Sequence, residues 1–257
     1  MTGAQVTFTA PASGSSAALN PTSPVTVTCS GSPAVCTASV AATANGTAGT
    51  YAVNASAAGA TPVAFSLTNS PASATMTLSD LGPYTYDGTA KSATCTTNPS
   101  IATSITYDGS TTPPTNAGSY AVVCTVTDPN YTGSANGTLT IAKAGQTITF
   151  TPPASGAVGG SATLSATGGN SGNPVTFASQ TGSICSVSGA TVSYLAAGAC
   201  TMRASQADNA NYNAAPDVDR NIAIGGAPAD IPTLSEWALL LLTGLFGLFG
   251  IRRWRRT

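Results

Sequence analysis

The sequence predicts an all-β protein: tandem small β-sandwich domains, followed by a single C-terminal transmembrane helix. Three observations lead to this prediction. Short runs of alternating apolar and polar residues are separated by Gly, Pro and Asn, at about the 8 to 12 residue spacing typical of sandwiches. One strand pattern recurs three times along the chain. The C-terminal residues form an apolar run that ends in arginines.

The recurring pattern divides the chain into domains. It covers Ala48–Ala55, Ala117–Cys124 and Ala197–Ala204, and each copy opens with Ala-Gly and then places alternate residues on one side. A repeat of about 70 to 80 residues indicates tandem domains. We therefore predict domains at residues 1–71, 72–142 and 143–225, a flexible linker at 226–230 and a separate tail at 231–257.

The first predicted domain has three strand candidates. They are Gln5–Thr9, Pro24–Thr28 and Ala64–Leu67, and turn-forming residues separate them. Whether this domain is complete at its start is left open.

The second predicted domain carries two Asp-Gly pairs, Asp87-Gly88 and Asp108-Gly109, which are hairpin signals. Tyr84–Ala90, Thr115–Tyr120 and Asn130–Gly133 resemble the MBG domain, a bacterial Ig-like module found in tandem in large surface proteins. The resemblance implies a small β-sandwich-like unit and no catalytic role.

The third predicted domain opens with Gln146–Phe150 and closes with Asn221–Ile224. Five further short strand candidates lie between these two segments, which favours an all-β sandwich. The segment is similar to bacterial Ig-like repeats that carry an Asn-Tyr pair late in the domain, here Asn211-Tyr212.

The six cysteines fall as one pair in each predicted domain: Cys29 and Cys36, Cys95 and Cys124, Cys185 and Cys200. The chain has no His and no CxxC spacing, which excludes a zinc site built from Cys and His. We predict three local disulfides and an oxidising compartment.

The tail predicts a membrane segment whose C-terminus is cytoplasmic, because no charge interrupts Trp237–Ile251 and a basic cluster follows. A buried core helix is the alternative. The tail resembles the IPTL-CTERM sorting signal of Gram-negative bacteria, although Ala238 stands where the family often has Gly. The resemblance implies processing by an exosortase, a membrane-embedded cysteine protease or transpeptidase. The residues of the sorting signal in this chain are Ile231, Pro232, Thr233, Leu234 and Trp237. The arginines that follow the apolar run form the cytoplasmic basic stop, which resists translocation: Arg252, Arg253, Arg255 and Arg256.

The composition gives little support to a catalytic or a nucleic-acid-binding function. The chain has no His, which excludes a hydrolase of the Ser-His-Asp type. The aspartates lie mainly in turns, where Asp caps its own backbone. Residues 1–230 hold four Lys and Arg against eight Asp, so no basic patch is expected. We predict no enzyme activity, cofactor, metal or nucleic-acid partner. A calcium site at Asp208, Asp217 and Asp219 and an isopeptide bond from Lys91 or Lys143 are the less favoured alternatives.

Five tyrosines allow a surface for a glycan or protein ligand, although core-covering tyrosines are the simpler interpretation. They are Tyr84, Tyr86, Tyr107, Tyr131 and Tyr212.

The sequence therefore predicts a non-enzymatic exported protein with a spacer or adhesion role. We expect it to be tethered to the inner membrane through its tail and then, after processing, to reach the cell surface or extracellular matrix. The alternative is a C-terminal accessory fragment of a larger surface enzyme or adhesin. The residues after Met1 show no secretory signal, so we expect the true start to lie upstream or the chain to be a fragment.

Overall fold

The computed structural model describes residues 3–226, and every regular element among them is a strand. It divides into a first compact unit that ends at Lys143 and a second that begins at Ala144. Within residues 3–226, no helix has the length and apolar character needed to cross a membrane. The predicted transmembrane helix lies outside the described residues and stays a prediction.

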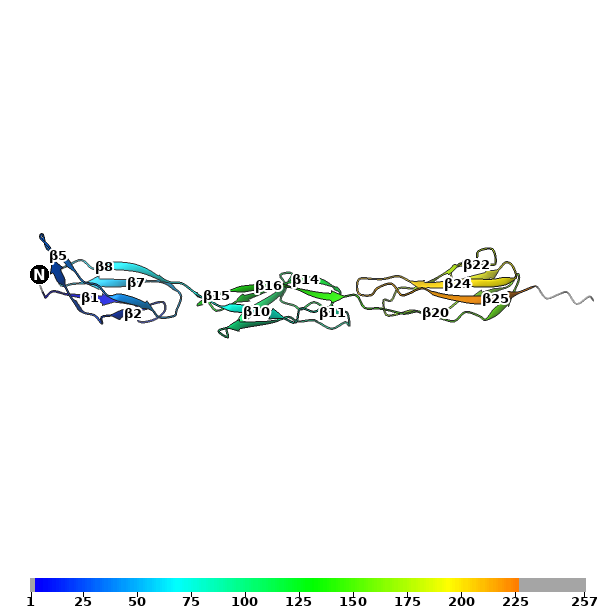
Figure 1. Ribbon diagram of the computed structural model, residues 1–257, viewed down its shortest axis with the longest axis horizontal. Coiled ribbons are helices and arrows are strands. Elements are labelled where there is room, and N and C mark those ends of the chain that lie inside the picture. Colours follow the sequence, from blue (N-terminus) through cyan, green and yellow to red (C-terminus); the bar gives the residue numbers. More distant parts are fainter. Residues whose placement is uncertain (1–2, 227–257) are drawn as a thin grey trace, which may run out of the picture. The chain divides into compact units, whose positions relative to one another are not determined.

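The first predicted domain forms a four-stranded sheet, a two-stranded sheet and a hairpin (Figure 1). The four-stranded sheet has the order β3-β1-β7-β8, β2 pairs with β6, and β4 pairs with β5. In β7 the alternation is visible directly, because Tyr51 and Val53 are buried between more exposed neighbours. The strands are β1 (Gln5–Thr9), β2 (Ala17–Asn20), β3 (Val25–Thr26), β4 (Thr28–Ser30), β5 (Val35–Thr37), β6 (Ala41–Ala44), β7 (Gly49–Ser56) and β8 (Val63–Asn69).

The second predicted domain has a four-stranded sheet of order β11-β16-β14-β13, which faces the pair β10-β12 across an apolar core. Its buried residues include Val122, Leu139 and Ile141, supplied by alternate positions of β14 and β16. The strands are β9 (Ala72–Ser73), β10 (Thr75–Ser79), β11 (Tyr84–Thr85), β12 (Thr94–Asn98), β13 (Thr103–Tyr107), β14 (Gly118–Val126), β15 (Tyr131–Thr132) and β16 (Ser134–Ala142), with β9 and β15 paired in parallel.

Only one of the two Asp-Gly hairpin signals is confirmed. Asp108 and Gly109 both have positive φ, 48° and 84°, and form a tight turn between Tyr107 and Ser110, as a type I′ turn requires. The prediction at Asp87-Gly88 is wrong, because the flanking strands β11 and β12 lie in different sheets. There the Asp87 carboxylate accepts hydrogen bonds from its own local backbone and side chains, an alternative turn chemistry.

The third predicted domain is a sandwich of a four-stranded sheet, β18-β25-β24-β21, and a three-stranded sheet, β19-β23-β22. Its core includes Phe150, Met202 and Ile222. The strands are β17 (Thr149–Phe150), β18 (Ser155–Ala157), β19 (Ser161–Thr163), β20 (Ala166–Thr167), β21 (Val175–Ser179), β22 (Cys185–Ser188), β23 (Thr191–Tyr194), β24 (Gly198–Gln206) and β25 (Val218–Gly225).

Strand pairing stays within each of the three predicted domains. A side-chain hydrogen bond nevertheless crosses the predicted boundary near residue 71, because the Asn130 carboxamide accepts from the Ala48 amide at 2.8 Å. The first compact unit includes both sides of that boundary. The division at residue 71 therefore stays a prediction.

The recurring sequence pattern becomes β7, β14 and β24. Each is an inner strand of its four-stranded sheet, and the three pair antiparallel with β8, β16 and β25, respectively. Gly49 and Gly198 open their strands with φ of 137° and 143°, a conformation that favours glycine. The repeat in the sequence therefore marks the centre of each sheet.

Candidate functional site

The predicted sorting signal and the basic stop, from Ile231 to Arg256, lie outside the described residues. The linker at 226–230 is described only at Gly226. These assignments remain predictions from the sequence. The candidate features that the structure does describe are disulfides, charged side chains, tyrosines and one apolar cleft.

The structure contains the three local disulfides that the cysteine spacing predicts. Two of them join the two sheets of a sandwich: Cys95 in β12 bonds to Cys124 in β14, and Cys185 in β22 bonds to Cys200 in β24. The third differs, because Cys29 and Cys36 are direct neighbours across the β4-β5 hairpin. A bond between sheets fixes non-local packing, whereas a bond within a hairpin closes only a short loop.

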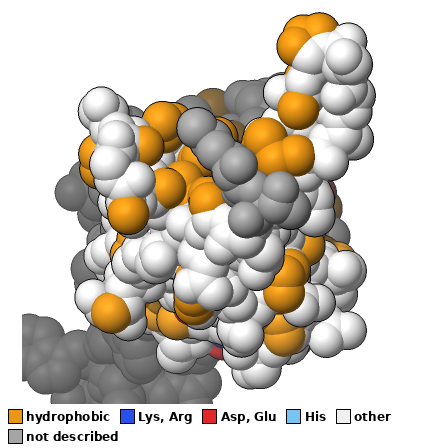
Figure 2. Space-filling view, turned by 90° about the vertical axis from the view of Figure 1, so that its left-hand side faces the viewer, with side chains coloured by type: hydrophobic (Ala, Val, Ile, Leu, Met, Phe, Trp, Pro, Cys, Tyr) orange, Lys and Arg blue, Asp and Glu red, His pale blue; other side chains and the backbone are white. Residues whose placement is uncertain are grey.

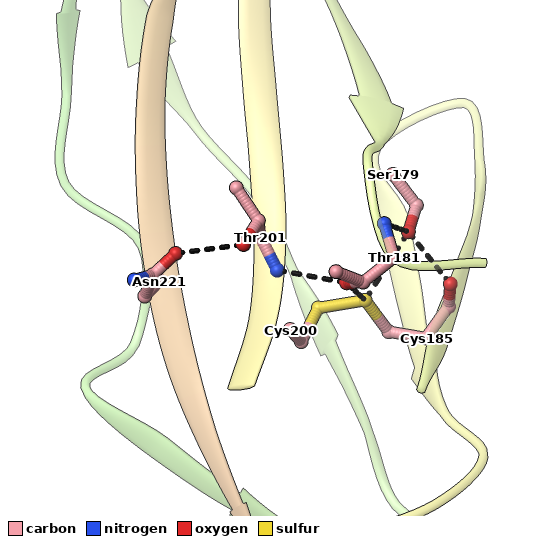
Figure 3. The surroundings of a disulfide bond; sticks show 6 residues. All are labelled: Ser179, Thr181, Cys185, Cys200, Thr201 and Asn221. Carbon is pink, nitrogen blue, oxygen red and sulfur yellow. Dashed lines mark hydrogen bonds between the residues drawn. A yellow bond between two sulfur atoms is a disulfide. The ribbon is translucent and has the colours of Figure 1, made fainter. Parts of the chain in front are cut away.

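The Cys185–Cys200 bond is fully buried and lies among hydroxyl groups (Figure 3). The Ser179 hydroxyl donates to the Cys185 carbonyl at 2.7 Å, and its oxygen lies 3.3 Å from the Cys185 Sγ. The Thr181 hydroxyl oxygen accepts from the Thr201 amide at 2.9 Å, and it lies 3.5 Å from the same sulfur. These contacts hold the loop after β21 against β24, so the site is a structural cross-link.

Arg203 forms a bidentate ion pair in the second unit. Its Nε and Nη2 donate to the two carboxylate oxygens of Asp219, both at 2.8 Å, and its Nη1 lies 3.4 Å from Asp217. The bidentate hydrogen bond from Arg203 lowers the pKa of Asp219, and the same contact raises the pKa of Arg203.

Asp217 and Asp219, two of the candidates for a calcium site, are both paired with the Arg203 guanidinium. Across residues 3–226, no group of three or more Cys, Asp or Glu residues is placed to hold a metal ion.

Lys91 lies in a small polar cluster beside the core of the second domain. Its Nζ donates to the Asp87 carboxylate at 2.6 Å and to the Thr89 hydroxyl at 2.9 Å, and it lies 5.6 Å from the centre of the Tyr84 ring. The hydrogen bond from Lys91, followed by those from Thr89, holds the pKa of Asp87 well below its ordinary value. The lysine is held in an ion pair with an exposed carboxylate.

The five tyrosines considered as a ligand surface are all buried or half-buried. Tyr107 is buried, and its hydroxyl accepts from the Ala93 amide at 2.8 Å. Tyr84 and Tyr86 pack against the same apolar core, and the Tyr84 hydroxyl donates to the Asp80 carbonyl at 3.0 Å. Tyr131 and Tyr212 are half-buried. The simpler interpretation, in which tyrosines cover the core, applies to Tyr84, Tyr86 and Tyr107.

The sequence did not point to an apolar cleft in the first domain. The cleft has a volume of about 300 Å³ and opens between the sheet of β1, β7 and β8 and the pair β2-β6. Nearby, Val63 and Phe65 of β8 are 54% and 49% exposed. Its apolar lining includes Phe8, Leu19, Val40, Val53, Phe65 and Leu67.

Figure 2 views the molecule from the left-hand side of Figure 1, and apolar side chains reach the surface there among backbone and uncharged side chains. The sequence signal that was available is the alternation of Val63, Phe65 and Leu67, which marks one face of β8 without saying whether anything covers it.

Two family models match parts of the chain. Residues 74–145 match the MBG domain, and residues 231–256 match the IPTL-CTERM motif. Both resemblances expected from the sequence are therefore confirmed at the expected places. A search of curated proteins found no match.

Solved structures similar to the chain are distant. Domains 1–6 of the surface layer protein SbsC share 17% identity at a TM-score of 0.30, over 70% of this chain and 32% of that one. Immunoglobulin domains 1–4 of Sidekick-1 share 12% identity at a TM-score of 0.30, over 87% and 68%. Titin domains I67–I69 share 11% identity at 0.29, over 87% and 88%. The chain thus spans about a third of the SbsC structure, and similarities this low carry no functional argument.

Proposed function

We propose that this chain is a non-enzymatic exported surface protein, whose small β domains are delivered and then released or attached through the C-terminal tail. The observation that carries the proposal is the match of residues 231–256 to the IPTL-CTERM motif. A sorting motif determines destination, and a membrane enzyme of the exosortase type would cut the chain within or near the motif. The all-β body, with an MBG domain at 74–145, supports a role outside the cytoplasm.

The body suits a mechanical role as a spacer. Two disulfides each tie the facing sheets of one sandwich, so a pulled chain cannot extend through the residues that they enclose. Disulfides persist in oxidising compartments, which agrees with export.

The experiment is mass spectrometry of the C-terminal peptide of mature protein from the native host, with and without the candidate exosortase. The expected result is a terminus near Ile231–Trp237 only when the enzyme is present. Pro232→Ala should block this cut, whereas Ala229→Ser in the linker should leave it unchanged. An intact Arg256-Thr257 terminus in both strains would overturn processing and leave a permanently anchored protein.

The apolar cleft of the first domain favours a second candidate function, which is adhesion. A pure spacer needs no exposed apolar surface, whereas a binding module does. Val63 and Phe65 supply such a surface beside the cleft.

A further inference from the structure

Parallel strand contacts fasten both ends of the second predicted domain. At its start, Ala72 of β9 pairs with Tyr131 of β15. At its end, Ala142 of β16 pairs with Thr85 of β11. The other strand pairings among residues 72–142 are antiparallel. The two parallel contacts therefore hold the chain where it enters and where it leaves this domain.

The third predicted domain repeats the arrangement. Ala144, close to its start, forms a parallel bridge with Tyr212, and the Ala144 amide donates to the Asn211 carbonyl at 2.9 Å. Gly225, the last residue of β25, pairs in parallel with Ala157 of β18. Both domains thus fasten their two ends in the same way.

Backbone hydrogen bonds of 2.8 to 3.2 Å make these contacts. The amide-to-carbonyl bonds are Ala72 to Asn130, Ala74 to Thr132, Thr140 to Leu81, Tyr86 to Ala142, Ala144 to Asn211, Asn213 to Ala144, Ala223 to Ala154 and Val158 to Gly225. In each domain the bonds therefore lie at both ends of the chain segment that forms it.

The parallel direction decides how a pull on the chain acts on these contacts. In each contact, one strand leads back to the N-terminal side of the domain and the other leads on to its C-terminal side. Pulling the two ends apart therefore slides the paired strands past each other along their length. The hydrogen bonds lie across this motion and are loaded together, whereas a hairpin pulled at its open end loses its bonds one at a time.

Buried side chains oppose slipping of these strands by one residue. Ile141 pairs with Tyr84 and is 2% exposed, and Ile224 pairs with Gly156 and is 5% exposed. Each isoleucine belongs to the apolar core of its domain. A one-residue slip would turn it to the opposite face of the sheet. Sliding therefore exposes an isoleucine before new hydrogen bonds form, which raises the barrier to opening under load.

The two disulfides between sheets lie outside the path of the load until these contacts open. The Cys95–Cys124 and Cys185–Cys200 bonds span 29 and 15 positions of the sequence. The residues of the parallel contacts all lie outside these two spans. The contacts therefore bear a load first, and the disulfides limit how far an opened domain extends.

We propose that this chain is a load-bearing tether, in which the parallel contacts of the second and third domains act as shear clamps. The clamps set the load at which each domain opens, and the disulfides then keep part of the chain from extending. Only the origin of the load rests on the proposed function, because a chain held through its tail carries any force that is applied to its body.

The test is constant-force spectroscopy of the purified full chain, with handles inserted at two alternative pairs of positions. Handles after Ser70 and after Lys143 pull the ends of the second domain along its clamps. Handles in the Asp108-Gly109 turn and after Lys143 instead pull β13 away from β16 across the sheet, so that strand pairs separate one after another. The domain should survive at least about tenfold longer in the first geometry.

Reduction of the disulfides separates the role of the clamps from that of the cross-link. In the first geometry, a reductant should lengthen the opening step of the second domain by about 100 Å, which is 29 residues at about 3.4 Å each. The lifetime under load should change less than it does on removal of one clamp hydrogen bond, because the disulfide bears no load before opening.

A matched pair of substitutions removes that one hydrogen bond. Ala72→Pro deletes the amide that donates to the Asn130 carbonyl and should shorten the lifetime under load about fivefold. Ala72→Val keeps the amide at an exposed position and should leave the lifetime unchanged. Thermal unfolding of both variants without load checks that each is folded.

Equal lifetimes in the two pulling geometries would overturn the proposal, as would equal effects of the two substitutions at Ala72. A reductant that shortens the lifetime more than Ala72→Pro does would transfer the load to the disulfide and would also overturn it. Processing of the tail is measured separately, and the handles replace the anchor. An unprocessed tail therefore leaves the clamps standing, and weak clamps leave the sorting function standing.

Discussion

At the scale of single residues, Gly156 shows how closely β18 is packed. A side chain there would run into the ring of Tyr194, which is only 4% exposed. We predict that Gly156→Ala lowers the free energy of unfolding by about 1 to 3 kcal/mol, the usual cost of overpacking. Urea unfolding followed by circular dichroism measures this, with Ser155→Ala on the exposed neighbour as the control. Equal stability of the two variants would show that the ring moves aside.

The cysteines differ in exposure, which predicts an order of reduction. Cys36 is exposed in the hairpin, whereas Cys185 and Cys200 have no exposed surface. Under native conditions we expect Cys29–Cys36 to be reduced first and Cys185–Cys200 last, because exchange requires access to the sulfur. Timed alkylation with mass spectrometry gives the order. Early labelling of Cys200 would mean that the second unit opens readily.

The ion pair of Asp87 predicts a dependence of stability on pH. Lys91 lowers the carboxyl pKa in the folded protein below the value of about 3.9 expected in the unfolded chain. The stabilisation is therefore complete above about pH 4 and is lost as the pH falls through the lowered pKa. The small difference in Tm between the protein and Asp87→Asn should shrink below that pH. High salt at neutral pH should shrink it too, and a difference that grows in acid would contradict the assignment.

At the scale of elements, β8, β16 and β25 pair in the same way with β7, β14 and β24, but β8 ends its sheet whereas β16 and β25 have a strand on each side. This difference predicts unequal hydrogen exchange in the three strands. The amide of Thr68 should exchange much faster than those of Thr140 and Ala223, which donate to the Leu81 and Ala154 carbonyls. Nuclear magnetic resonance of the unliganded protein measures all three. Comparable protection at Thr68 would mean that something already covers the edge.

Elements were predicted well where the signal was local. The recurring strand became β7, β14 and β24, and the Asp108-Gly109 pair formed its turn, because both depend on side-chain alternation or backbone conformation within a few residues. The Asp87-Gly88 pair failed, because the identical dipeptide there is followed by Thr89 and Lys91, which bind the carboxylate.

At the scale of the whole molecule, the two compact units predict separate unfolding transitions. Replacing both Cys185 and Cys200 by Ala should destabilise the second unit by about 3 kcal/mol, the cost of releasing a loop of this length. Its Tm should fall by about 10 °C or more, while the transition of the first unit stays in place. Calorimetry distinguishes the two, and the Cys29→Ala, Cys36→Ala pair serves as the control. One transition that shifts as a whole would contradict independent units.

The sequence by itself determined the all-β class, the repeat, and the MBG and IPTL-CTERM assignments, and it predicted three local disulfides whose pairing the structure then fixed. These depend on residue order and on periodicity. Only the tertiary structure decided that Asp217 and Asp219 meet Arg203, that Tyr107 is buried, and that β8 ends its sheet. The physical reason is that an ion pair, a buried hydroxyl and a strand edge are each defined by a partner, present or missing, from elsewhere in the chain.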